Sequence, residues 1–133
     1  MKVSIIINES LPNGLAANTA AVIGISLGAM YPSIVGEAVK DAEGNEYSGI
    51  TSLVIPILSA DENKITEIVK NVRLDDGIEL IPFTKVAQRN KTYDAYTAEM
   101  LGTIAEDITY SGIALIGSGK RVAKYTGSLP LLS

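Results

Sequence analysis

The stretch KVSIIINESLPNGLAANTAAVIGISLGAM, residues 2–30, decides the fold class. Its first seven residues, KVSIIIN, are rich in β-branched side chains and almost continuously apolar, which predicts a strand covered on both faces. Pro12 and Gly14 then break the chain, and the Ala-rich residues 15–30 are too long for a buried strand and predict a helix. A strand, a short turn and a helix make half of a βαβ unit, so this strand is expected at the centre of an α/β sheet.

The predicted helix is small as well as apolar. Ala16, Ala20, Gly24 and Gly28 recur every four residues and form one stripe. Each glycine inside a helix costs about 1 kcal/mol relative to alanine. Close approach of another backbone is the simplest compensation, and that backbone belongs either to the sheet or to a partner subunit. A homodimer through this helix is therefore one of the expected outcomes.

The rest of the chain predicts further strands over residues 51–58, 78–83 and 108–117, and a small exposed hairpin over residues 39–49. Pro56 indicates that one side of its strand is not fully paired. Helices are expected after the capping residues Asp61, Thr92 and Ser118, and a short one over residues 84–89. These elements predict one domain, residues 1–133, with a three-layer α/β/α fold and a mixed sheet of about four strands.

Composition narrows the chemistry. The chain has 133 residues, a net charge of −4 and a sequence pI of about 4.8, which argues against a nucleic-acid partner unless a local basic patch exists. It has no Cys and no His, so disulfides, thiolate nucleophiles and histidine triads are excluded. Without a phosphate-loop, dinucleotide or metal motif, no cofactor and no metal are expected. No targeting segment or membrane span is recognised, so we expect a cytoplasmic protein without membrane contact.

Two groups of basic residues are candidates for binding an anion. Lys85, Arg89 and Lys91 form the first group, and Lys120, Arg121 and Lys124 the second. Each group is either a solvated face or, if the two meet in space, a basic patch for a phosphate or carboxylate. Asn18 follows the carboxyl end of the first strand, the place where open α/β sheets bind ligands. Its amide either orients a ligand or satisfies loop backbone groups, and the sequence leaves both alternatives open.

Several segments resemble known families. LAANTAAV (residues 15–22) resembles the Gly-Lys-Ile-Ala-Ala-Gln helix start of type II peptidyl-tRNA hydrolases, and KYTGSLPLL (residues 124–132) resembles their Val-Thr-Gly-x-Leu-x-Leu ending. The combination of NESLPNGLAANTAA, DAEGNEYSGITSLVIPIL, AQRNKTYDAY and YTGSLPLL is closer to an uncharacterised family, the domain of unknown function numbered two thousand. That family is grouped with the hydrolases by fold, so the resemblance implies a peptidyl-tRNA hydrolase II-like fold and no particular activity.

The hydrolase pattern carries over only in part. Its glutamine falls on Asn18, whereas its lysine falls on Gly14. Its Asp-Ala-Gly-x-Thr segment has no counterpart, because residues 82–101 fill that place. Ester hydrolysis needs stabilisation of the charge that develops on oxygen. Losing the lysine and the aspartate together argues against peptidyl-tRNA hydrolysis.

Three functional hypotheses follow. The first is a protein that binds a small anionic ligand, with or without an unidentified enzymatic activity, in a pocket between the turn at residues 8–18 and the segment 88–93. Its predicted ligand-binding residues are Asn8, Asn18, Gln88, Arg89, Tyr93 and, near the rim, Lys120. The second is a divergent hydrolase acting on peptidyl-tRNA or another ester. The third is a non-catalytic, dimeric interaction module that uses the small-residue helix.

Overall fold

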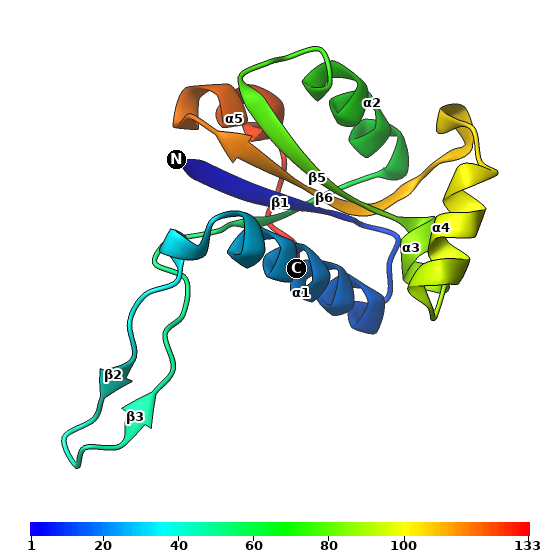
Figure 1. Cartoon of the computed structure of the whole chain (residues 1–133). Helices are drawn as coiled ribbons and strands as arrows, with labels where there is room; N and C mark the ends of the chain where they lie inside the picture. The colour runs from blue at the N-terminus through cyan, green and yellow to red at the C-terminus, as the bar shows by residue number, and fades with distance from the viewer.

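The computed structural model describes all 133 residues of the chain (Figure 1). The principal strands are β1 (Lys2–Asn8), β4 (Ile57–Ala60), β5 (Ile78–Thr84) and β6 (Tyr110–Gly117). The α-helices are α1 (Asn13–Met30), α2 (Glu62–Val72), α3 (Lys85–Arg89), α4 (Tyr93–Leu101) and α5 (Gly119–Thr126). A short hairpin, β2 (Val39–Lys40) and β3 (Glu46–Tyr47), and two 3-10 turns, η1 (Pro32–Ile34) and η2 (Ala105–Asp107), complete the chain.

The four principal strands form one mixed sheet in the order β4-β1-β6-β5. β1 is parallel to β4 and antiparallel to β6, and β6 is also antiparallel to β5. Three strands therefore run in one direction, and β1, β4 and β5 end at the same side of the sheet, which we call the carboxyl edge. The opposite side, where β6 ends at Gly117 beside Lys2, is the amino edge.

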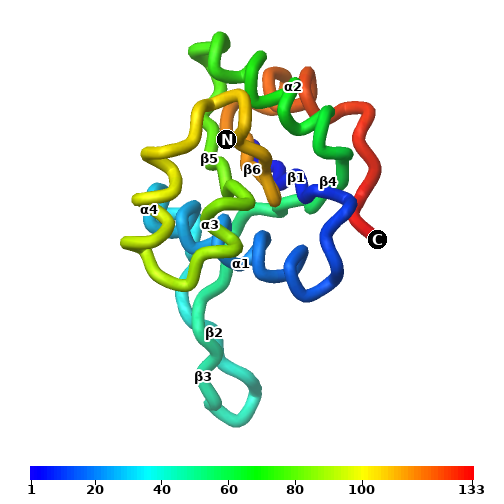
Figure 2. Tube along the Cα trace, turned by 90° about the vertical axis from the view of Figure 1, so that its right-hand side faces the viewer, coloured from blue at the N-terminus to red at the C-terminus, as the bar shows by residue number.

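Three layers result, as the sequence predicts (Figures 1 and 2). Ile5 and Ile7 of β1 point to one face of the sheet, where they pack with Ile23 and Leu27 of α1. Ile6 points to the other face, which α2 and α5 cover. The near-continuous apolar run of β1 is explained by this position, because both of its faces are buried.

The buried face of the first helix consists of Ala16, Thr19, Ile23 and Leu27, and the half-buried Ala20 and Val22 pack beside it against the same core. A side chain built at Gly24 or Gly28 would meet no atom within 4 Å. The sheet therefore does not make the close approach that the small-residue stripe suggested. By length and composition α1 is apolar enough to cross a membrane, yet its inner face forms one layer of a globular domain.

The predicted helix caps are confirmed. The carboxylate of Asp61 accepts a hydrogen bond from the backbone N–H of Lys64 at 2.7 Å. The hydroxyls of Thr92 and Ser118 accept equivalent bonds at the starts of α4 and α5. Such caps depend on neighbouring residues alone, so they are visible in the sequence.

The predicted strand over residues 51–58 is largely wrong, because β4 covers only Ile57–Ala60. Thr51 instead bridges Val35, and Pro56, which has no N–H to donate, precedes the strand. The apolar tail runs along the outer side of β4, where the N–H of Ser59 donates to the Pro130 carbonyl at 2.9 Å. The edge strand is thereby covered by the last residues of the chain.

Residues 35–54 form an arm that leaves the body at the end of α1 and carries the predicted hairpin at its tip (Figures 1 and 2). Both views show the arm projecting beyond α1, on the side of that helix that faces away from the sheet. Gly44 turns the hairpin with a φ of 87°, a conformation that suits glycine.

Candidate functional site

A hollow of about 410 Å³ opens at the carboxyl edge, between the turn that follows β1 and the short helix α3. Its lining residues are Ser10, Leu11, Leu15, Lys85, Gln88 and Arg89. The sequence predicts a pocket between the turn at residues 8–18 and the segment 88–93, and of that second segment only Gln88 and Arg89 line this hollow. We call this hollow the carboxyl-edge pocket.

Asn8 supports the turn that forms one wall of the pocket. The side chain is 1% exposed, and its Oδ1 accepts hydrogen bonds from the backbone N–H of Ser10 at 3.0 Å and from the Ser10 hydroxyl at 2.7 Å. Its Nδ2 donates to the Tyr110 carbonyl at 3.1 Å. The carboxamide thus fastens the turn to the start of β6, and the structure places it beneath the pocket, not on its lining.

Gln88 forms the second wall and joins three elements. Its Nε2 lies 3.0 Å from the Leu15 carbonyl and 3.0 Å from Thr19 Oγ1. The Asn18 Oδ1 lies 3.3 Å from the same nitrogen, so three acceptors share its two hydrogens. On the other side, Gln88 Oε1 accepts from the fully buried hydroxyl of Ser111 at 2.6 Å. Asn18 and Gln88 therefore lie together as predicted, and their contact holds α3 against the start of α1.

Two cations line the pocket, and each has a carboxylate neighbour. Lys85 Nζ lies 2.6 Å from Glu62 Oε1, with the Lys85 side chain 33% exposed. Arg89 forms an ion pair with Glu99 through Nη2 alone, and its side chain is 59% exposed. The remaining guanidinium N–H groups have no protein acceptor and are free for a ligand.

The start of α1 adds a third positive element. Pro12 occupies the capping position and provides no side-chain cap, and the first turn holds no acidic residue. A side chain built at Gly14 would meet no atom within 4 Å, so the first turn is open to solvent. The unpaired N–H groups and the positive end of the helix dipole favour an anion here.

The other predicted residues lie elsewhere. Tyr93 is 80% exposed and stacks edge to face on Tyr96, with ring centroids 5.4 Å apart. It lines a separate hollow of about 380 Å³ between α1 and α4. Lys120 lies in the first turn of α5 at the amino edge, the opposite side of the sheet, because β6 runs antiparallel to β1. Lys120 therefore does not lie at the rim of the carboxyl-edge pocket, and the two basic groups do not meet.

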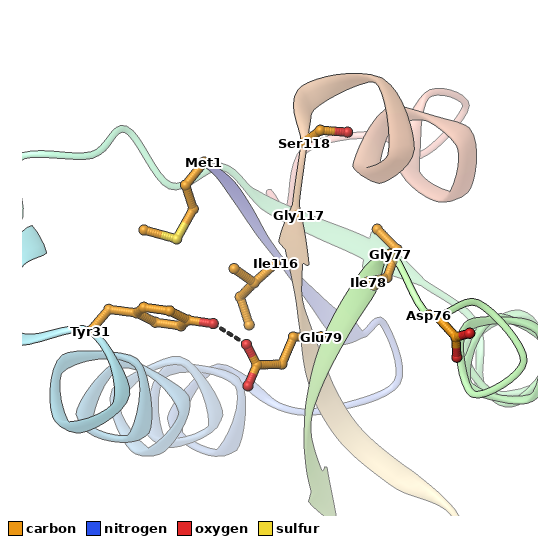
Figure 3. A pocket seen from close by; sticks show the side chains of 9 residues that line it. All are labelled: Met1, Tyr31, Asp76, Gly77, Ile78, Glu79, Ile116, Gly117 and Ser118. Atoms are coloured by element: carbon orange, nitrogen blue, oxygen red, sulfur yellow. Dashed lines mark hydrogen bonds between the residues drawn. The ribbon is translucent and has the colours of Figure 1, made fainter.

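The amino edge has hollows of its own, which the sequence does not predict. One of about 570 Å³ is bordered by Tyr31 and Glu79, whose side chains point toward each other (Figure 3). The hydrogen bond from the Tyr31 hydroxyl to the Glu79 carboxylate raises the pKa of Tyr31 above its usual value. These polar groups satisfy one another, and no lysine or arginine side chain joins them on the lining.

A neighbouring hollow of about 710 Å³ surrounds Asp75. The Asp75 carboxylate accepts from the Gly77 N–H at 2.9 Å, the Tyr125 hydroxyl at 2.8 Å and the Arg121 guanidinium at 2.7 Å. Chiefly because of the Gly77 and Tyr125 bonds, the pKa of Asp75 is lowered, and the same carboxylate raises the pKa of Tyr125. No local sequence pattern marks this network, because the Arg121 and Tyr125 partners lie 46 and 50 residues away from Asp75. Its bonds connect the start of β5 to α5.

The geometry defines an α/β domain with a positively lined pocket at the carboxyl edge of its sheet. The whole chain, residues 1–133, matches the model of a family described as a protein of unknown function, DUF2000, and the chain belongs to that family. Among solved structures, it is similar to the protein of unknown function Atu0240 from Agrobacterium tumefaciens strain C58. That likeness has a TM-score of 0.89 and 20% sequence identity, and covers 99% of this chain and 97% of that one, so it shows a shared fold. No curated protein matches the chain. The resemblance to type II peptidyl-tRNA hydrolases stays a prediction.

Proposed function

We propose that this protein binds a small phosphate- or carboxylate-bearing molecule in the carboxyl-edge pocket. The observation that carries the proposal is the convergence of Lys85, Arg89 and the uncapped start of α1 on one hollow. The 410 Å³ volume is within the range of small-ligand pockets, which begins at about 300 Å³.

An incoming anion has to compete with Glu62 and Glu99 for the two cations. Both ion pairs are partly exposed, and pairs of this kind contribute only about 0–1 kcal/mol. A ligand oxygen also gains the backbone N–H groups of α1, which no protein side chain occupies. The planar guanidinium of Arg89 suits a bidentate grip on a carboxylate or phosphate.

A catalytic form of the same proposal needs a proton acceptor near the pocket. With no His and no Cys in the chain, Glu62 and Glu99 are the carboxylates that contact its cations. The alternative of a divergent hydrolase acting on a tRNA-linked ester requires a continuous basic surface that leads to Asn18. The separation of the two basic groups to opposite edges favours the small ligand over that alternative.

Thermal unfolding, followed by circular dichroism at constant ionic strength, tests the proposal with inorganic phosphate and with succinate. Ligands that bind only the folded state raise its melting temperature, and the rise grows with the logarithm of ligand concentration over the dissociation constant. We expect such a rise for the wild type, and its loss in Arg89→Ala, because one charge-assisted hydrogen bond is worth about 1.5–3 kcal/mol, or tenfold and more in affinity.

Lys120→Ala is the matched control, since it removes one exposed cation from the opposite edge. It should keep the full rise in melting temperature. An equal rise in wild type and Arg89→Ala, or a loss confined to Lys120→Ala, would place anion binding outside the carboxyl-edge pocket.

A further inference from the structure

The arm, residues 35–54, is firmly built at its base. The Ile34 carbonyl accepts from the N–H of Ser52 at 2.6 Å and from its hydroxyl at 2.9 Å. Gly36 and Gly49 lie so close that a side chain at Gly49 would collide with the Gly36 carbonyl. The two sides of the arm therefore meet in a contact that only glycine permits.

The tip of the arm is organised by one carboxylate. Asp41 accepts from the N–H groups of Glu43 and Asn45 at 2.9 and 3.0 Å, from the Asn45 amide at 3.0 Å and from the Tyr47 hydroxyl at 2.9 Å. These bonds, led by those from Asn45, lower the pKa of Asp41 to about 2. The hairpin is thus fixed by a local polar network.

Nothing in the protomer covers this ordered arm. Every residue from 35 to 48 is exposed, including the apolar side chains of Val39 and Tyr47. Ile50, near the base, is 77% exposed. Isolated two-stranded hairpins are marginally stable in water, so a hairpin without a core of its own gains from an external surface.

The outer face of α1 is a second uncovered surface. Residues 10–36 contain no charged side chain, and Ala17, Ala21, Gly24 and Ile25 on this helix are exposed. Ile25 is 75% exposed, and the space beside Gly24 is open. A surface helix normally carries charged residues on its outer side, and this one carries none.

We propose that a second copy of this chain covers both surfaces, with the two α1 helices packed antiparallel about a two-fold axis and the arms exchanged. The arm projects past the outer face of α1, so it borders the space that a partner helix would fill (Figures 1 and 2). In an antiparallel pair, the carboxyl end of one α1 lies beside the amino end of the other. The arm that follows one helix then runs along α3 and α4 of its partner, and two-fold symmetry makes this contact twice.

Charge complementarity supports a second copy as the occupant. The arm carries four carboxylates, at Glu37, Asp41, Glu43 and Glu46, against one cation, Lys40. The segment 85–91 carries three cations and no acid. Glu62 and Glu99 pair with Lys85 and Arg89, whereas Lys91 is exposed and has no carboxylate partner in the protomer. An acidic arm and a receiving segment with an unpaired cation are therefore present in the same chain.

A shaped recess accompanies this charge. The hollow of about 380 Å³ between α1 and α4 is lined by Val22, Ser26, Lys91, Tyr93 and Tyr96, among others. The apolar and aromatic walls of this recess suit the Val39 and Tyr47 side chains of an arm. The Lys91 cation at its side suits the carboxylates that lie next to them in the arm. We assign this recess as the place where the partner's arm docks.

A membrane fits the same surfaces less well. Helices that lie on membranes present large apolar side chains and basic flanks. The outer face of α1 offers mainly alanine and glycine, and the adjoining arm is acidic, so an anionic lipid surface would repel it.

The first test measures the mass of the full chain in solution by light scattering and sedimentation. We expect a dimer for the wild type, and at least tenfold weaker dimerisation for Ile25→Glu, which puts a carboxylate in the middle of the helix pair. Leu74→Glu is the matched control, because Leu74 is 87% exposed and follows α2 on the other face of the sheet. A wild type that stays monomeric at every concentration would overturn the proposal, whether or not it binds lipid vesicles. Equal effects of Ile25→Glu and Leu74→Glu on dimerisation would also overturn it.

The second test isolates arm exchange by reversing charge. One variant carries Glu43→Lys and Glu46→Lys in the arm, and the other carries Lys91→Glu in the receiving segment. Each variant alone should dimerise about tenfold more weakly than the wild type, because both arm contacts of its dimer then bring like charges together.

A mixture of the two variants should form heterodimers with near wild-type affinity. In such a heterodimer, the unchanged acidic arm of one protomer meets the unchanged Lys91 of the other. The basic arm of the second protomer meets the Lys91→Glu segment of the first. Failure of the mixture to recover dimers, with both variants folded by circular dichroism, would rule out arm exchange. Anion binding does not enter these measurements, so their outcome is independent of the proposed function.

Discussion

The carboxamide of Gln88 contacts residues that lie 69, 70 and 73 positions earlier in the chain and one that lies 23 positions later. Gln88 and Asn18 are predicted from the sequence to line one ligand-binding pocket, and the structure brings their side chains together. What the residues alone did not reveal is that much of this polarity is used internally. The buried hydroxyls of Thr19 and Ser111 are the partners, and nothing in the local sequence marks them.

Removing the Gln88 side chain should therefore destabilise the fold. In Gln88→Ala, the Ser111 hydroxyl loses its acceptor at a fully buried position, which costs about 1–3 kcal/mol. Urea unfolding of Gln88→Ala, Ser111→Ala and the double variant measures the coupling. We expect the double variant to lose about 1 kcal/mol less free energy of unfolding than the two single variants lose together. The reason is that neither partner of the hydrogen bond is then left buried without the other. Strict additivity would show that the 2.6 Å contact contributes nothing to stability.

Helices were predicted better than strands. The caps at Asp61, Thr92 and Ser118 and the buried stripe of α2 depend on residues within one or two turns of each other. The first half of the strand expected over residues 51–58 instead belongs to the arm. At the base of the arm, Ile50 and Ser52 form backbone hydrogen bonds with Gly36 and Ile34, which lie 14 and 18 positions earlier in the chain. The small-residue stripe of α1 predicted close approach of either the sheet or a partner subunit. The structure excludes the sheet, because no atom lies close to Gly24 or Gly28.

The hairpin at the tip of the arm should depend on pH. The pKa of Asp41 is about 2 in the folded arm against 3.8 for the unperturbed group, so its carboxylate binds fewer protons in the ordered hairpin. Its stabilising effect is fully present above pH 3.8 and is lost as the pH falls through about 2. We expect the amide resonances of Glu43 and Asn45 to move with that midpoint in an NMR titration. Asp41→Asn should abolish the transition; an unchanged midpoint in that variant would assign the titration to another group.

The layers and the central strand of the whole molecule follow from hydrophobic patterns, because β1 is buried on both faces. The placement of Lys120 does not follow from these patterns. It depends on whether β6 pairs parallel or antiparallel with β1, and no residue near Lys120 in the sequence indicates that direction. That single pairing puts the two basic groups at opposite edges. It leaves the carboxyl-edge pocket with its own cations and with the open start of α1.

The most direct test of anion binding is an NMR titration of the isotopically labelled protein with inorganic phosphate and with succinate at constant ionic strength. We expect saturable shifts that are largest for the amides of residues 13–15 and 85–89, retained in Lys120→Ala and lost in Arg89→Ala. Shifts centred on residues 118–124, or no saturable shift with either anion, would rule out anion binding in the carboxyl-edge pocket.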